Sequence, residues 1–286
     1  MRTTTRVALV AVGALVAVGV AAPLAMRASS EPILVGTSLH REGEESHTDA
    51  FDRRTANWGA EPEIVRYFYP DLPRGQWPVF GSAETLVSFK APDVSLVPSG
   101  AYDGELIGYL EKIPDDGTPK RIAFYHEPED DIAAGRFTVQ EFRDALEHVD
   151  ALVDEHASHV EVGLILMGWT ANPESGRSVN DYVPDDPLDF IGWDIYPAPN
   201  EESTVTLYGH AAEASREASF PEWLIAETAP VESSSQQERA AWIPIAFDVA
   251  RDQGFTAVVY FDSTVGGDFR LTTQDTWDAM GAEIAS

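Results

Sequence analysis

Eight short apolar segments, spaced along most of the chain, constrain its fold more than any other feature of the sequence. Most of them are continuous stretches of Ile, Val, Leu and Phe rather than strict alternations of apolar and polar residues. Strands that are buried on both faces have this composition, which is typical of a parallel sheet covered by helices. The segments are 33–39, 63–70, 85–92, 121–129, 159–170, 189–197, 222–229 and 257–263.

Helical patterns separate several of these segments. Thr138 and Glu141 form a capping box in front of one amphipathic stretch. Ser235 and Glu238 form another, in front of a helix that we expect Gly254 to end. Further helix candidates cover 47–57, 103–113, 208–218 and 273–284.

Two connections do not have a helical pattern. Residues 71–82 and 171–186 are rich in Pro, Gly, Asn and Asp, which predicts loops. Alternation of strand and helix through eight strands nevertheless predicts an α/β fold, a single-domain (β/α)8 TIM barrel in which some helices are shortened or replaced by loops. This domain would cover 31–286, and a doubly wound open sheet is the alternative.

Residues 1–30 are set apart from the predicted domain. Arg2 and Arg6 precede 7–26, a run without any charge. This pattern predicts a signal peptide, although a run of about 20 uncharged residues is also long enough to be a membrane anchor. Either interpretation places the domain outside the cytoplasm, secreted or held at the outer face of the cell membrane.

The composition excludes several classes of function. The chain has no cysteine, so thiol catalysis and disulfides are excluded. Its net charge of −29 repels nucleic acid and anionic lipid, so we expect no nucleic-acid partner and membrane contact only through the possible anchor. The same charge argues against an acidic polysaccharide substrate. No glycine-rich phosphate loop is present, and we expect no cofactor and no metal.

The strand ends carry the candidate functional residues, because barrel enzymes place their catalytic groups at the carboxyl ends of the strands. Carboxylates and aromatic residues dominate these positions. They are Ser38, His40, Tyr67, Tyr69, Lys90, His126, Glu127, Trp169, Asp194, Tyr196, Glu227 and Asp262.

Glu127 and Glu227 are the candidate catalytic pair. Each lies at the end of an otherwise apolar segment, where a carboxylate is costly to bury without a purpose or a partner. Strands four and seven face each other across the barrel mouth. Cleavage of a glycosidic bond needs one carboxyl to protonate the leaving oxygen and another to attack the anomeric carbon, roughly 5–5.5 Å apart in retaining enzymes.

The order of these segments resembles clan A glycoside hydrolases, and is most similar to glycoside hydrolase family 26. His126 before Glu127, the stretch Ile225-Ala226-Glu227, and the stretches 258–262 and 268–271 carry this resemblance. In that clan the acid/base glutamate ends strand four and the nucleophile ends strand seven. The resemblance therefore implies a retaining glycosidase acting on a β-linked neutral polysaccharide or oligosaccharide, with β-mannan as the first expectation and β-glucan or xylan behind it.

The chain departs from the family 26 pattern at several positions. Phe124 stands where the family usually has Arg, and Tyr260 and Phe261 stand where it usually has Trp. Pro128 and Glu129 replace the residues that usually follow the acid/base glutamate. These departures concern the sugar specificity more than the reaction.

Tyr196, Arg66 and His126 are candidates for supporting roles. The resemblance implies that Tyr196 donates a hydrogen bond to Glu227, and a barrel-rim aromatic is the alternative. Arg66 is expected on the nucleophile's side of the site or else in a buried ion pair. His126 is expected to orient Glu127 or to contact a sugar hydroxyl, against the alternative of a core histidine.

Trp169, Asp194 and Asp262 are candidates for contacts with the sugar. An indole offers a flat apolar face on which sugar rings pack, but a core tryptophan is the alternative for Trp169. Asp194 and Asp262 are candidates for binding sugar hydroxyls, or else they only support the rim.

Two other functions remain open. The stretch 126–131 is dense in oxygen ligands, which suggests a metal-dependent hydrolase, yet the zincin pattern needs a second His where Asp130 stands. A carbohydrate-binding barrel without catalysis is the other alternative. Such a protein would keep its sugar affinity without turnover after the substitution Glu127→Gln.

Overall fold

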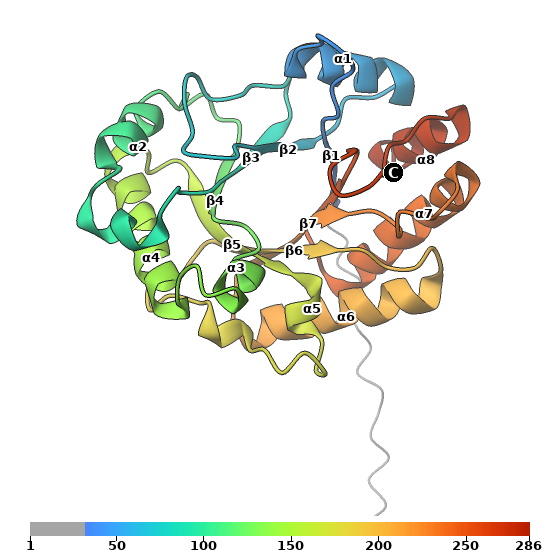
Figure 1. Cartoon of the computed structure of the whole chain (residues 1–286). Coiled ribbons are helices and arrows are strands. Elements are labelled where there is room, and N and C mark those ends of the chain that lie inside the picture. The colour runs from blue at the N-terminus through green and yellow to red at the C-terminus, as the bar shows by residue number, and fades with distance from the viewer. Residues whose placement is uncertain (1–31) are drawn as a thin grey trace, which may run out of the picture.

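A computed structural model describes residues 32–286 (Figure 1). Its eight strands form a closed parallel barrel in the order of the sequence, with β1 next to β8. This arrangement confirms the predicted (β/α)8 fold and rules out the open sheet. Each strand coincides with one of the apolar segments. The strands are β1 (Leu34–Ser38), β2 (Ile64–Phe68), β3 (Glu84–Phe89), β4 (Lys120–Phe124), β5 (Glu161–Met167), β6 (Phe190–Ile195), β7 (Glu222–Thr228) and β8 (Ala257–Tyr260).

Alternate residues of each strand point into the barrel or out against the helices. The inner set is Ile64, Leu86, Ala123, Ile165, Phe190, Leu224, Ala226, Ala257 and Val259, and all of its members are completely buried. Small residues leave room for the large ones: a Cβ added at Gly163 would come within 2.4 Å of the Phe190 ring. Because both faces of the strands are covered, apolar residues dominate their middle positions.

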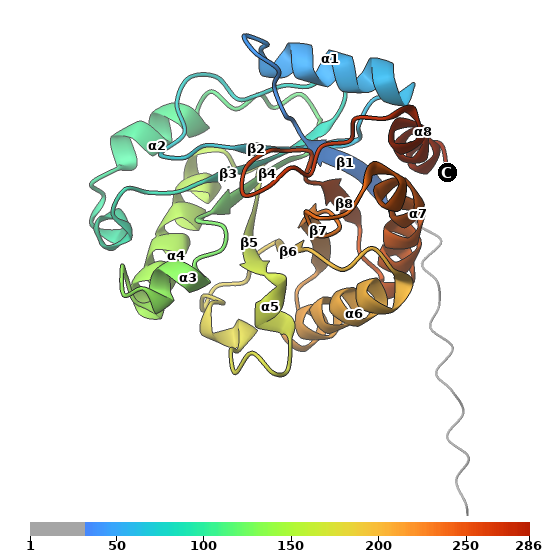
Figure 2. The same ribbon diagram turned by 45° about the vertical axis from the view of Figure 1, so that its right-hand side comes forward.

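Helices surround the barrel, as a second view shows (Figure 2). The two predicted capping boxes are present: Thr138 with Glu141 begins α4, and Ser235 with Glu238 begins α7, which ends before Gly254 in the left-handed conformation. The helices are α1 (His47–Trp58), α2 (Asp103–Leu110), α3 (Glu129–Ala133), α4 (Val139–His156), α5 (Gly168–Ala171), α6 (Glu201–Glu217), α7 (Gln236–Gln253) and α8 (Gln274–Ile284), with 3-10 turns η1 (Val94–Ser99) and η2 (Val179–Asp181).

The predicted loops are also confirmed. No helix separates β2 from β3, and between β5 and β6 the chain forms only the one-turn α5 and the short η2. The fifth apolar segment was predicted to continue to 170, but β5 ends at Met167 and Gly168 begins α5. The fourth was predicted to continue to 129, but β4 ends at Phe124 and Glu129 begins α3. The chain leaves the sheet early because Tyr125 and Glu127 adopt positive φ angles, which no strand residue has.

A buried arginine closes the amino-terminal end of the barrel. Arg121 of β4 is paired with Glu84, with Glu161 at 2.8 Å and with Glu222 at 3.1 Å, and these are the first residues of β3, β5 and β7. The side chain of Arg121 is 6% exposed. Because the contacts join four strands, they hold the strand starts together at the end of the barrel opposite the candidate site.

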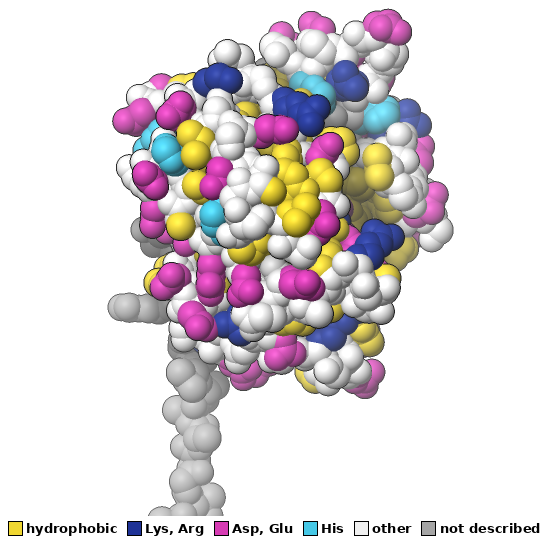
Figure 3. Space-filling model, turned by 60° about the vertical axis from the view of Figure 1, so that its left-hand side comes forward, with side chains coloured by type: hydrophobic (Ala, Val, Ile, Leu, Met, Phe, Trp, Pro, Cys, Tyr) yellow, Lys and Arg dark blue, Asp and Glu magenta, His cyan; other side chains and the backbone are white. Residues whose placement is uncertain are grey.

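The predicted leader or anchor in 1–30 lies outside the described residues. Within 32–286, no helix is both long and apolar enough to cross a membrane. The surface in Figure 3 carries many more acidic than basic side chains, in keeping with the net charge of −29.

Candidate active site

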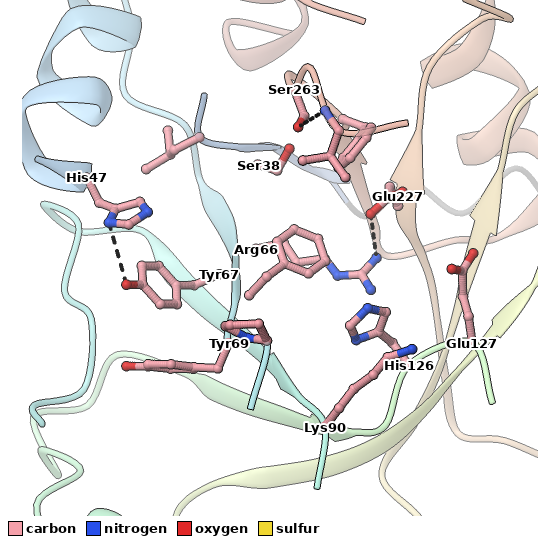
Figure 4. A pocket seen from close by; sticks show the side chains of 15 residues that line it. Ser38, His47, Arg66, Tyr67, Tyr69, Lys90, His126, Glu127, Glu227 and Ser263 are labelled. Carbon is pink, nitrogen blue, oxygen red and sulfur yellow. Dashed lines mark hydrogen bonds and ion pairs between the residues drawn. The ribbon is translucent and has the colours of Figure 1, made fainter. Parts of the chain in front are cut away.

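A cavity of about 480 Å³ lies at the carboxyl ends of the strands (Figure 4). Four of the residues to which the sequence analysis gave a role line it, and they come from β2, β7 and the loop after β4. These residues are Arg66, His126, Glu127 and Glu227. Aromatic side chains form much of the remaining wall, namely Tyr67, Phe68, Tyr69 and Phe261.

Glu227 reaches this cavity because β7 is irregular. Ala226 points into the barrel and Ile225 points outward, so regular alternation would send Glu227 outward as well. The pairing with β6 shifts at this point: Ile225 pairs with Trp193, but Glu227 already pairs with Asp194. One extra residue on β7 is a β-bulge, and a bulge re-aims the side chains that follow it. Glu227 therefore lines the cavity.

Two groups stabilise the charged form of Glu227. The Tyr196 hydroxyl donates a hydrogen bond to Oε1, and Nη1 of Arg66 lies 3.4 Å from Oε2. Burial raises the pKa of Glu227, whereas Arg66 and the Tyr196 hydroxyl act against that rise. The hydrogen bond that the resemblance implied for Tyr196 is thus present in the structure.

Arg66 is a completely buried cation that serves two acids. Its Nη1 also donates to Oδ1 of Asp194 at 2.5 Å, and its guanidinium lies 4.5 Å from the centre of the Phe68 ring. Asp194 is buried too, and burial raises its pKa to about 7 against the opposing charge of Arg66. The two alternatives for Arg66 are therefore both correct: it lies beside Glu227, and it forms a buried ion pair with Asp194.

Glu127 lies in a strained loop. Tyr125 and Glu127 have φ angles of 51° and 52°, a left-handed conformation that costs about 1–3 kcal/mol per residue for side chains other than glycine. The backbone N–H of Glu127 donates to the carbonyl oxygen of Ile165 at 3.0 Å, which fixes the loop on β5. Strained backbone of this kind is typical of functional sites, where surrounding contacts hold it.

The environment of the Glu127 carboxyl differs from that of Glu227. Among the described residues, no side chain donates a hydrogen bond or forms an ion pair to the Glu127 carboxyl, although Arg66 and Lys90 are near enough to lower its pKa. Burial, and then the charge of Asp194, raise the pKa of Glu127 to about 7. Glu127 therefore lacks the paired donors that favour the ionised form of Glu227.

His126 and Lys90 lie beside Glu127 in the cavity (Figure 4). The His126 ring packs edge-on against Phe68, with ring centres 5.5 Å apart, and its Nδ1 is buried without a hydrogen-bond partner. Burial lowers the pKa of His126 well below its usual value, so the ring is neutral. Lys90 lies 4.6 Å from the centre of the Tyr125 ring and 3.7 Å from Asp131.

The structure places the other candidates away from the cavity wall. Asp194 is the buried partner of Arg66. Asp262 is completely buried, pairs with Arg54 and accepts a hydrogen bond from the Leu271 amide at 3.0 Å, so its contacts are those of a structural ion pair rather than of a sugar-binding group. Trp169 lies in α5, beyond β5, and is 49% exposed, which excludes the alternative of a core tryptophan.

Sequence reasoning assigned no role to several residues of the site. Tyr67, Tyr69 and Lys90 were noted only as strand ends, and His47 only as part of a helix, yet all four line the cavity. For Tyr67, Tyr69 and Lys90, a position near the end of an apolar segment was the available signal. For His47 no signal existed, because α1 brings it to the cavity through tertiary packing against Tyr67, with ring centres 4.6 Å apart.

Solved structures with a similar fold are glycoside hydrolase domains. The family 26 domain of an endo-β-mannanase/endo-β-glucanase from Prevotella bryantii has a TM-score of 0.64 at 11% identity, covering 91% of this chain and 94% of that one. A glucosidase from Croceicoccus marinus has a TM-score of 0.63 at 14% identity, covering 89% and 67%. A family 128 endo-β-1,3-glucanase from Amycolatopsis mediterranei, in complex with laminaritriose, has a TM-score of 0.54 at 16% identity, covering 87% and 99%.

These comparisons support the fold, but they do not identify a single family, as the resemblance in the sequence did. The chain shares the barrel fold of these glycoside hydrolase domains, and they include families 26 and 128, so they do not single out family 26. No family model matches the chain, and no curated protein matches it in sequence.

Proposed function

We propose that this protein is a retaining glycoside hydrolase, with Glu227 as nucleophile and Glu127 as acid/base. One observation carries the proposal: two carboxyls from β7 and from the loop after β4 line the same cavity in unlike environments. Glu227 is held by a hydroxyl and a guanidinium, whereas within the described residues no side chain donates to the Glu127 carboxyl, whose pKa burial raises to about 7. A nucleophile and an acid need this difference.

The proposed reaction has two steps. In the first, a carboxylate oxygen of Glu227 attacks the anomeric carbon, the glycosidic C–O bond breaks, and the Glu127 carboxyl gives its proton to the leaving oxygen. In the second, the Glu127 carboxylate takes a proton from water while the water oxygen attacks the anomeric carbon and displaces Glu227. Both residues then return to their starting protonation states.

The neighbouring residues support these steps. In the proposal, Arg66 and the Tyr196 hydroxyl keep Glu227 ionised before attack and stabilise it again as the leaving group of the second step. Neutral His126, beside Glu127, is the candidate for contact with a sugar hydroxyl.

The proposed substrate is a β-linked neutral polysaccharide or oligosaccharide, with β-mannan first and β-glucan or xylan behind it. The aromatic cavity wall supports a sugar substrate, because sugar C–H faces pack on aromatic rings. Trp169, exposed beyond β5, is a candidate platform for sugar units outside the cavity. The similar solved structures include a mannanase/glucanase and a β-1,3-glucanase that holds laminaritriose.

We also propose that the protein acts outside the cytoplasm. A polymeric substrate requires export, and the uncharged run 7–26 behind two arginines would provide it as a signal peptide or anchor. Cell fractionation with the full chain tests this independently: the proposal requires the activity outside the cytoplasm.

A panel of neutral β-glycans, with reducing-end detection, tests for turnover. Glu227→Ala should lower turnover by more than about a thousandfold, because the step that forms the covalent intermediate is lost. Added azide should partly restore release of an activated leaving group and yield a glycosyl azide of inverted configuration. Wild-type turnover in this variant would disprove the assignment.

Two further measurements separate the alternatives. NMR of the first-formed product shows retention or inversion of the anomeric configuration, and inversion would contradict Glu227 as nucleophile. Sugar affinity without turnover, unchanged by Glu127→Gln, would instead identify a carbohydrate-binding barrel. Activity that a chelator removes would favour a metal-dependent hydrolase, although no cluster of three metal-ligating side chains occurs within 32–286.

A further inference from the structure

Glu129 is a buried carboxyl, two residues after Glu127, to which the proposed mechanism assigns no task. Its side chain is almost completely buried, with 1% exposed, and it begins α3. In the sequence it stands out only as a departure from the family 26 pattern. An acid this deeply buried requires hydrogen-bond partners, and the identity of those partners indicates what it does.

The partners of Glu129 lie on the next strand of the barrel and the turn that follows it. Oε1 accepts a hydrogen bond from the backbone N–H of Met167 at 2.9 Å and another from the Thr170 hydroxyl at 2.6 Å. Met167 ends β5, and Thr170 lies in α5. The carboxyl is therefore directed at β5 and α5, whereas Glu127 lines the cavity.

A second contact ties α3 back to the start of the same loop. Asp131 accepts a hydrogen bond from the Tyr125 hydroxyl at 2.7 Å. The loop 125–128 is thus held at one end through Asp131 and at the other through Glu129. This loop contains both left-handed residues, Tyr125 and Glu127.

We propose that Glu129 is a positioning residue, which clamps the loop 125–128 against β5 and α5 and so aims the Glu127 carboxyl into the cavity. This inference rests on the proposed function, because it concerns the placement of the acid/base residue. A strained loop relaxes when its outer contacts are removed, and a catalytic group displaced by about 1 Å can lose about 100-fold in rate.

The leaving group of the substrate provides the test. Two substrates with the same sugar are compared, one with an acidic phenol as leaving group and one with a sugar or alcohol. The value of kcat/KM reports the first step, in which an acidic phenol departs without a proton from Glu127. Glu129→Ala should lower kcat/KM by about 10–100-fold on the poor leaving group and by less than about threefold on the phenol.

Matched variants keep or remove single contacts. Glu129→Gln retains a carbonyl oxygen for Met167 and Thr170 and should remain near wild type on both substrates. Thr170→Val removes one donor and should lower kcat/KM selectively on the poor leaving group, while Thr170→Ser keeps the hydroxyl and should not. If Glu129→Ala does not fold by circular dichroism, the pair of Thr170 variants decides the question.

The outcomes separate this inference from the proposed function. Equal losses on both substrates, or no loss on either, would show that Glu129 serves only stability or nothing at all, and would overturn the inference. If that result came with an inactive Glu227→Ala, the inference alone would fail. If Glu227→Ala kept wild-type turnover, the proposed function itself would fail.

Discussion

Nη1 of Arg66 lies 3.4 Å from Oε2 of Glu227, so a completely buried guanidinium supports one carboxyl of the candidate pair directly. The same guanidinium binds Asp194 and lowers the pKa of Glu127 only from a greater distance. One positive charge is thus shared unequally among three acids. Because a buried charge needs compensation, this inequality favours the ionised form at Glu227 more than at Glu127.

The first prediction concerns the pH dependence of the reaction. The pKa of Glu127 is raised to about 7, and the first step needs its proton, so kcat/KM should fall as the pH rises through about 7. This basic limb should be present when the leaving group is a sugar or alcohol, which needs the proton. It should be absent with an acidic phenol as leaving group, in the wild type and in Glu127→Gln alike. A basic limb that persists in Glu127→Gln would assign the titration to another group.

The second prediction concerns Lys90, whose charge lowers the pKa of Glu127. Asp194 and Asp130 act in the opposite direction, and Arg66 acts in the same direction as Lys90. Lys90→Met should therefore move the basic limb of kcat/KM to higher pH, while Lys90→Arg should leave it near its wild-type position. An unmoved limb in Lys90→Met would show that its ammonium does not act on Glu127.

The third prediction concerns the hydroxyl of Tyr196, which donates to Oε1 of Glu227. Tyr196→Phe removes this donor and keeps the ring against Phe261 and Phe269. Loss of one hydrogen bond to a charged group, worth about 1.5–3 kcal/mol, should lower kcat/KM by about 10–100-fold and move the acid limb to higher pH. Unfolding measurements should show a stable protein, and a wild-type rate would contradict the role.

The fourth prediction concerns stability. Arg121→Ala leaves the carboxylates of Glu84, Glu161 and Glu222 without their shared cation and should lower the free energy of unfolding by about 3–5 kcal/mol. Arg74→Ala is the control, because Arg74 is 71% exposed and pairs with Glu105 at 3.5 Å, a contact worth less than about 1 kcal/mol. Urea unfolding measures both. An equal decrease in the free energy of unfolding for both variants would show that the buried ion pairs of Arg121 stabilise the fold no more than an exposed pair does.

Much of the fold follows from local sequence patterns. Apolar runs fit strands that are buried on both faces, and the capping boxes at Thr138 and Ser235 mark where helices begin. These signals depend on residues that are close together in the chain, so they can be recognised from the sequence alone. The end of the fourth strand was predicted too late, because an apolar pattern does not reveal the positive φ angles of Tyr125 and Glu127.

The candidate site follows from the sequence only in outline. The positions of Glu127 and Glu227 at the ends of apolar runs were visible. The bulge at Ala226 turns Glu227 toward the cavity, and no residue type in the sequence indicates a bulge there. The sequence also does not distinguish Asp262 from Asp194. In the structure, Asp262 pairs with Arg54 and Asp194 pairs with Arg66.

The sequence by itself determined that this chain forms a barrel of buried strands with acids at their carboxyl ends, because burial and helix capping depend on side chains close together in the chain. The tertiary structure alone decided how those acids differ. Arg66 and Asp194 are 128 positions apart, and only closure of the barrel brings them together beneath Glu227. The proton affinity of a buried carboxyl is set by the charges and dipoles that surround it in space, and these are arranged by the fold.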